Sequence, residues 1–157
     1  MEPSDQEIGD LHWLMDILQT IDVGLVVLNR NYQIQLWNSF MENHSGLRPD
    51  QTKGKNLFEL FDEIDEEWFK KKSEAVFLLN TRAFTIHEQR PYLFKFYNNR
   101  PITGRTDTMY QNATIIPLSN SDGSTNHICL IIYDATNAAM NKLALDKCLS
   151  MQAKNID

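Results

Sequence analysis

Apolar residues near the start of the chain recur at spacings of three and four, which predicts an amphipathic helix over residues 5–21. Ser4 or Asp5 supplies a side-chain oxygen that accepts hydrogen bonds from the unpaired amides of the first turn. We expect one face of this helix to cover the protein's own sheet and the other to bind a partner chain. The apolar residues form two stripes, the first of Ile8, Leu11, Met15 and Leu18 and the second of Leu14, Ile17 and Ile21.

The pattern then changes to one that predicts a β-hairpin. Residues 25–28 are apolar throughout, as in a strand covered on both faces, and residues 32–37 alternate between apolar and polar, as in an edge strand. Residues 38–61 break into pieces that predict two or three short helices, with Asn38 as a candidate cap and Gly46 as a candidate helix stop.

The second half of the chain predicts one long helix, three strands and a terminal helix. Residues 65–80 have an amphipathic pattern, and residues 136–155 contain no glycine or proline and are rich in good helix formers. We expect an antiparallel meander between these helices, with strands at residues 92–97, 109–118 and 127–133. The predicted fold is α+β.

Length and charge restrict the function classes. With 157 residues the chain forms one compact domain, and its net charge of −6 disfavours a nucleic-acid binder. The two cysteines, Cys129 and Cys148, do not form a C-x-x-C motif, so we expect a reducing compartment and no structural zinc site. No signal peptide or long apolar run is present, so we expect a cytoplasmic protein with no membrane span.

The order of predicted elements resembles that of PAS domains. This resemblance covers residues 22–136 and implies a five-stranded antiparallel sheet, short helices over one face, and N-terminal and C-terminal helical extensions. It divides the chain into a helix at 1–21, a PAS domain at 22–134 and a signalling helix at 135–157. The segments that carry it are DVGLVVLN at 22–29 and IQLWN at 34–38 for the opening hairpin, HSGL at 44–47 and GKNLFEL at 54–60 for the helix turns, and DAT at 134–136 for the D-x-T signature.

A narrower resemblance concerns the effector. The segments RPYLF at 90–94, RPITG at 100–104 and MYQN at 109–112 are similar to a bacterial PAS subgroup that precedes GGDEF diguanylate cyclase domains. The helix after Asp134 resembles the linker into such a domain, and no GGDEF sequence follows it in this chain. The resemblance therefore implies a homodimeric sensor that controls a C-terminal diguanylate cyclase, an enzyme that makes cyclic di-GMP.

The sequence lacks the residue patterns expected for a metal, haem or photoreactive flavin site. The four histidines share no metal-binding spacing, so no metal site is predicted. Haem-binding PAS domains commonly place the axial histidine on the long helix, and residues 65–80 contain none, so haem is disfavoured. Photoreactive flavin needs a cysteine that residues 42–54 lack. The identity of any ligand stays open, as does its existence.

Several side chains are candidates for holding a small organic ligand. Trp37, Trp68, Tyr110 and Asn112 are aromatic and amide groups of the kind that hold planar rings, although both tryptophans also suit the core. Arg100, with Gln111 and Asn112, would suit a polar or anionic molecule, and the alternative is an exposed loop arginine beside two amides that pair with backbone.

Signal output is expected at the end of the domain, where Asp134 and Thr136 would cap the terminal helix. No phosphate loop, nucleophile elbow or calcium loop occurs, so we expect no enzymatic activity in the chain itself. The alternative to a ligand sensor is a ligand-free dimerisation module whose pocket is filled by its own side chains, with Phe69, Phe77, Phe94 and Phe96 as the fillers.

Overall fold

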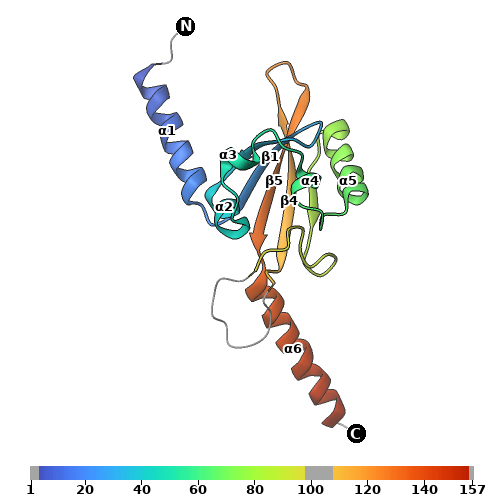
Figure 1. Ribbon diagram of the computed structural model, residues 1–157. Helices are drawn as coiled ribbons and strands as arrows, with labels where there is room; N and C mark the ends of the chain where they lie inside the picture. The colour runs from blue at the N-terminus through green and yellow to red at the C-terminus, as the bar shows by residue number, and fades with distance from the viewer. Residues whose placement is uncertain (1–3, 98–107, 156–157) are drawn as a thin grey trace.

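An antiparallel sheet with strand order β2-β1-β5-β4-β3 forms the centre of the domain (Figure 1). The computed structural model describes residues 4–97 and 108–155. The PAS-type α+β fold predicted above, with five antiparallel strands, is confirmed. The strands are β1 (Gly24–Asn29), β2 (Ile34–Trp37), β3 (Ala83–Thr85), β4 (Gln111–Ser119) and β5 (Thr125–Asp134).

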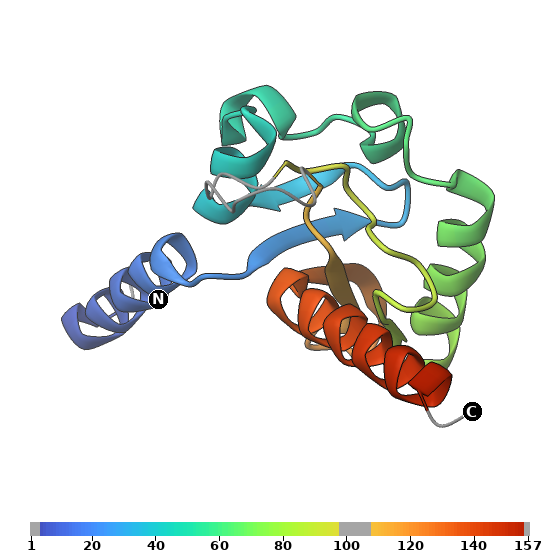
Figure 2. The ribbon, with the colours of Figure 1, turned by 90° about the horizontal axis from the view of Figure 1, so that it is seen from below.

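The helices fall into a group that covers the sheet and two that project from the domain. Figures 1 and 2 show α2 to α5 on one side of the sheet, whereas α1 and α6 extend outward in different directions. The helices are α1 (Asp5–Thr20), α2 (Ser39–Ser45), α3 (Pro49–Thr52), α4 (Leu57–Leu60), α5 (Glu66–Leu79) and α6 (Thr136–Asn155).

The core lies between α5 and the inner face of the sheet. Val26 of β1 is opposite Leu130 of β5, which is opposite Ile115 of β4, and all three are almost fully buried. Phe69 and Val76, seven residues apart on α5, are fully buried against this layer. The alternation that predicted the hairpin and the helical period that predicted α5 therefore both mark the core-facing side chains.

The predicted strand at residues 92–97 is wrong, and the third strand of the sheet is β3 instead. Residues 92–97 are rich in apolar side chains because Leu93, Phe94 and Phe96 fill the core. Their backbone is held mainly by a side chain and not by a continuous strand ladder, since Leu93 and Phe94 both donate their amides to the side-chain Oε1 atom of Gln111. Single backbone hydrogen bonds from Gln111 to Pro91 and from Met109 to Phe96 complete the attachment. Burial without a backbone partner strand produces the same sequence pattern as a strand.

The expectation that α1 covers the sheet is also wrong. None of its residues is buried, and Figure 1 shows the helix standing away from the sheet. Its attachment is at its C-terminal end, where the Asn38 side-chain amide donates to the carbonyl oxygens of Leu18 and Val23 at 3.2 and 2.8 Å. The side-chain Oδ1 atom of Asn38 accepts from the amide of Leu25 and, as the predicted cap of α2, from the amide of Met41. One buried amide thus joins α1, β1 and α2.

At Gly24 the backbone of β1 lies close against side chains of α2. A Cβ atom there would lie 2.5 Å from the Met41 sulfur and 3.1 Å from both Phe40 and Ile132. Gly24→Ala is therefore expected to lower the free energy of unfolding by about 2 kcal/mol through overpacking. Gly9→Ala on α1 is the matched control, because nothing lies within 4 Å and no loss is expected. Equal denaturant midpoints for the two variants would contradict this prediction.

Candidate functional site

The site begins at the junction of the sheet and α6, which we call the joint and define by Tyr110, Asp134, Ala135 and Thr136. The backbone amide of Ala135 donates to the Tyr110 carbonyl oxygen at 2.8 Å, and the Tyr110 amide donates to the Thr136 hydroxyl oxygen at 3.1 Å. The Asp134 carboxylate accepts from the Thr136 amide at 3.0 Å. The first turn of α6 is therefore tied to the start of β4 as well as to the end of β5.

Asp134 and Thr136, both expected to cap α6, make different hydrogen bonds in the structure. The Asp134 carboxylate accepts a first-turn amide of α6, as predicted for a cap. The Thr136 hydroxyl instead accepts from Tyr110, so it joins two chain segments that are far apart in sequence. Thr136 is 3% exposed, which shields this hydrogen bond from water. The D-x-T motif thus fixes both the start of α6 and its attachment to β4.

Beyond its first turn α6 leaves the domain. Ala135 and Ala139 are buried, whereas every residue from Asn141 to Lys154 is exposed, including Leu145 and Leu149. A helix fastened at one end transmits a small rotation at that end as a larger displacement at the other. The geometry of α6 is therefore determined by the joint and by contacts close to it.

Gln111 and Asn112 follow the joint on β4 and point to opposite faces of the sheet. Gln111 is 2% exposed, and besides accepting from Leu93 and Phe94 its Nε2 atom donates to the Phe94 carbonyl oxygen at 2.7 Å. Asn112 uses its Oδ1 atom to accept from the backbone amide of His87 at 2.9 Å. The two amides thus hold separate segments and do not line one cavity.

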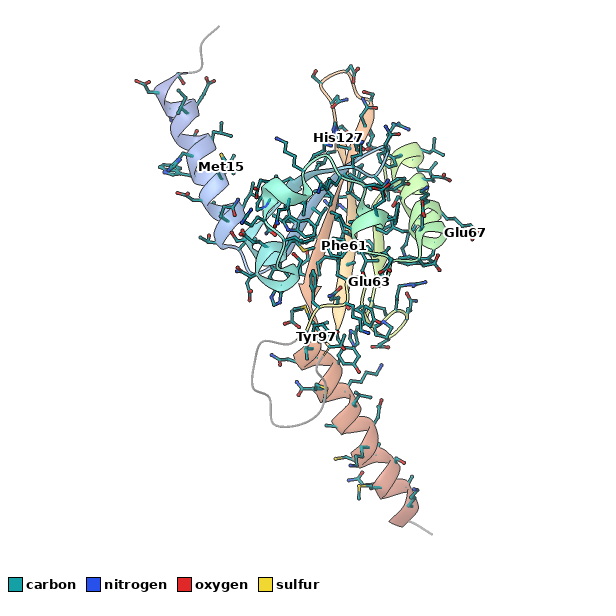
Figure 3. The ribbon with its side chains drawn as sticks, in the orientation of Figure 1. Met15, Phe61, Glu63, Glu67, Tyr97 and His127 are labelled. Atoms are coloured by element: carbon teal, nitrogen blue, oxygen red, sulfur yellow. The ribbon has the colours of Figure 1, made fainter. Side chains whose placement is uncertain are left out.

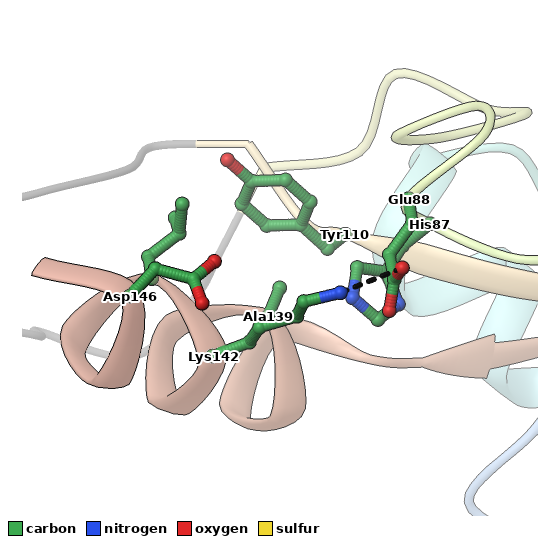
Figure 4. A pocket seen from close by; sticks show the side chains of 7 residues that line it. His87, Glu88, Tyr110, Ala139, Lys142 and Asp146 are labelled. Atoms are coloured by element: carbon green, nitrogen blue, oxygen red, sulfur yellow. Dashed lines mark ion pairs between the residues drawn. The ribbon is translucent and has the colours of Figure 1, made fainter. Parts of the chain in front are cut away.

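A second connection to α6 comes from the residues after β3. Glu88 forms an ion pair of 2.7 Å with Lys142, whose side chain extends from the second turn of α6 (Figure 4). This carboxylate raises the pKa of Lys142, and Lys142 lowers the pKa of Glu88. Both groups are about half exposed, so the pair contributes little stability, but it limits the directions that α6 can take.

The two predicted tryptophans lie elsewhere. Trp37 is 3% exposed, stacks on Phe61 with ring centroids 5.6 Å apart, and donates its indole N–H to the Leu47 carbonyl oxygen. Trp68 lies half-buried on α5, with the Arg90 guanidinium 3.9 Å from its ring centroid. Among the residues that the structure describes, neither tryptophan lines the cavity beside Tyr110. Arg100, the remaining candidate, lies outside the described residues.

Aromatic rings occupy much of the interior between the sheet and its helices. The ring centroid of Phe61, labelled in Figure 3, lies 5.0 Å from that of Phe94. The ring centroid of Phe94 lies 5.3 Å from that of Phe96. The ring centroids of Phe69 and Phe58, on the same side of the sheet, lie 5.8 Å apart. Three of the four phenylalanines proposed as fillers are at most 2% exposed and Phe77 is 8% exposed.

The two cysteines differ sharply in environment. Cys129 lies in β5 and is 9% exposed, and burial raises the pKa of its thiol to about 11. Cys148 is exposed on α6. Because the thiolate is the reactive form, iodoacetamide at pH 8 is expected to alkylate Cys148 in the folded protein and to spare Cys129. Peptide mass spectrometry before and after denaturation measures both sites, and equal labelling in the folded protein would contradict the burial.

His87, Glu88 and Lys142 are residues of this site that the sequence pattern did not indicate. Glu88 and Lys142 belong to different elements and share no spacing rule, so only the fold brings them together. Within residues 4–97 and 108–155, no helix combines the length and the apolar character needed to cross a bilayer. No three metal-binding side chains of those residues gather closely enough to hold an ion.

Comparison with known proteins gives one family. The model of the PAS fold family matches residues 14–135. A sensory box sensor histidine kinase from Vibrio cholerae has a similar structure, with 26% identity and a TM-score of 0.58 over 84% of this chain and 96% of that one. No curated protein sequence matches the chain.

Two further structures share the fold at lower identity. The PAS domain of a protein from Colwellia psychrerythraea is 15% identical, with a TM-score of 0.58 over 82% of this chain and 98% of that one. The PAS domain of BvgS from Bordetella pertussis is 16% identical, with a TM-score of 0.53 over 90% of this chain and 98% of that one. These two likenesses concern the fold, whereas the family match over residues 14–135 shows that the chain belongs to the PAS family, the sensory domains of signal-transduction proteins.

Proposed function

We propose that this PAS domain controls a C-terminal effector through the position of α6. The observation that supports this most strongly is that α6 is tied to β4 and β5 at the joint and is exposed from Asn141 to Lys154. A helix anchored in this way is suited to carrying a change in the sheet to a domain that follows it. The two unpaired cysteines favour a reducing compartment, so we place this sensor in the cytoplasm.

The mechanism requires two arrangements of α6 that differ by a few kcal/mol. Tyr110, the residue before β4, donates to Thr136 and accepts from Ala135, so a shift of β4 acts on Thr136 at the start of α6 and on the residue before it. A signal that favours one position of β4 therefore favours one direction of α6. Of the predicted ligand-binding residues, Tyr110 and Asn112 lie nearest to the start of α6. Tyr110 belongs to the joint, and Asn112 accepts a hydrogen bond from His87, whose ring packs against Tyr110.

A second copy of the chain is the proposed partner of α1. Ile8, Leu11 and Met15 are 51%, 59% and 55% exposed on this projecting helix, and Leu18 of the same stripe is half-buried. Met15 is labelled in Figure 3. Exposed apolar stripes of this kind are costly in water and are typical of interaction surfaces. Pairing of the α1 helices would produce a homodimer and bring two α6 helices into one assembly.

The effector that we propose is a diguanylate cyclase, on the basis of the sequence resemblance at residues 90–94 and 109–112. The coding sequence downstream of Asp157 tests this at once, because it should continue into a GGDEF domain. The longer protein should then convert GTP to cyclic di-GMP, and Thr136→Val should change the rate whereas Thr136→Ser should not. A kinase or other domain after α6, or an unchanged rate in Thr136→Val, would overturn this part of the proposal.

The interior supports a second candidate function, a dimerisation module that binds no ligand. The rings of Phe69, Phe94 and Phe96 fill space that a ligand inside the domain would need. Native mass spectrometry separates the two functions. A dimer that carries added mass favours the ligand sensor, and a dimer at the mass of two chains favours the dimerisation module.

A further inference from the structure

A cavity of about 260 Å³ lies between the domain and α6, next to the joint. Figure 4 shows that Tyr110, His87 and Glu88 line it from the domain, whereas Lys142 and Asp146 line it from α6. Leu143 adds an apolar wall from α6. The cavity lies outside the packed interior of the domain, and its walls belong to two parts that the proposed function requires to move relative to each other.

His87 presents a hydrogen-bond acceptor to this region. The backbone amide of His87 donates to the Asn112 Oδ1 atom at 2.9 Å, which fixes that atom as an acceptor. Nδ1 of His87 lies 3.1 Å from the same oxygen, so Nδ1 carries the proton and Nε2 of the neutral ring carries a lone pair. Nε2 is buried and has no hydrogen-bond partner among the described residues. A buried acceptor without a donor is unfavourable, and a ligand with an N–H group would satisfy it.

The charges around the cavity favour a cation. Lys142 is neutralised by Glu88 at 2.7 Å. Asp146, one turn further along α6, raises the pKa of Lys142 through its charge and lines the cavity as a second carboxylate. The carboxylates of Glu88 and Asp146 and the ammonium of Lys142 give these three side chains one net negative charge, and the group that needs a partner is an acceptor. The complementary ligand is positively charged, donates hydrogen bonds and has an apolar part that packs on Tyr110 and Leu143.

We propose that this cavity binds a small organic cation with an ammonium group, which donates to His87 Nε2 and pairs with Asp146. A ligand that contacts the domain and α6 together stabilises the direction of α6 in which both contacts are made. The binding site stands on the geometry of the cavity, whereas its effect on signalling rests on the function proposed above.

The test is an NMR titration of the ¹⁵N-labelled chain with 2-phenylethylamine, which has a primary ammonium group and an aromatic ring. The matched controls are 2-phenylethanol, which lacks the charge, and 3-phenylpropionate, which reverses it. We expect saturable shifts of the His87, Tyr110 and Lys142 amide signals at millimolar amine and none with the two controls. Absence of saturation, or equal binding of the alcohol or the acid, would overturn the proposal.

Asp146→Asn supplies the matched variant, because the residue is exposed and the change removes only the charge. It should weaken binding of the amine about tenfold, the effect of losing one charge-assisted hydrogen bond. Asp122→Asn, in the exposed loop before β5, should bind as the parent does. Equal affinities of the Asp146 variant and the parent would contradict the assigned site.

The outcomes for the site and for the proposed function are separable. A spin label on Cys148 reports the position of α6 independently of binding. If the amine binds saturably but the distance between the two Cys148 labels of a homodimer does not change, the binding site is supported and its role in signalling is overturned. A change of those distances in Thr136→Val with no amine binding would keep the proposed function and overturn the site.

Discussion

Replacing Gln111 with leucine is expected to lower the free energy of unfolding by about 3 kcal/mol or more. The change leaves the backbone amides of Leu93 and Phe94 without their buried acceptor and removes one of the two donors to the Phe94 carbonyl oxygen, which still accepts from the Phe96 amide. Each unsatisfied buried group costs about 1–3 kcal/mol, and leucine regains only part of this through its apolar side chain. Urea denaturation followed by tryptophan fluorescence measures the loss.

Gln89→Leu is the control for this experiment, since Gln89 is exposed and lies between β3 and β4, in the segment that contains residues 93–94. It should change the free energy of unfolding by no more than about 0.5 kcal/mol, as surface substitutions usually do. A loss in Gln111→Leu no larger than that in Gln89→Leu would show that residues 93–94 are held by other contacts. The assignment of Gln111 as the support of this segment would then be wrong.

The double variant Leu11→Asp, Met15→Asp is expected to weaken the proposed homodimer at least about a hundredfold, because each change places a carboxylate in the apolar stripe of both copies. Sedimentation velocity over a range of protein concentrations measures the dissociation constant. The domain itself should stay folded, since both side chains are exposed on the projecting helix. Far-UV circular dichroism checks this.

Leu78→Asp tests whether the effect belongs to α1. Leu78 is 76% exposed on α5, so the control adds a carboxylate at a leucine outside the stripe that is more accessible than Leu11 or Met15. It should leave the dimer intact. A monomeric parent chain at micromolar concentration, or dimers of equal strength in all three proteins, would refute the role proposed for α1.

Local periodicity predicted the elements whose partners are near in the chain. The apolar run of β1, the alternation through β2 and the helical period of α5 follow from core packing, and all three elements are found close to the expected bounds. The sequence does not reveal β3 in the same way, because it has three residues and its central Phe84 is 60% exposed. The run at 92–97 was misleading since its apolar side chains are buried while its amides bind Gln111.

The candidate site shows a similar limit. The D-x-T motif predicted where α6 begins and that Asp134 would cap it, because capping is a local interaction. The pairing of Thr136 with Tyr110 and of Glu88 with Lys142 depends on strand register and on the direction of α6. Consecutive residues of a strand face opposite sides of a sheet, so Gln111 and Asn112 do not share one pocket.

Spin-label distances at Cys148 test the central claim, that the joint determines the position of α6. Cys148 is exposed while Cys129 is buried, so the label attaches to α6 alone. In a homodimer, double electron–electron resonance gives the distance between the two labels. We expect one dominant distance in the parent chain, the same distance in Thr136→Ser, and a second population in Thr136→Val, which lacks the oxygen that accepts from Tyr110. Identical distance distributions in all three proteins would contradict the account.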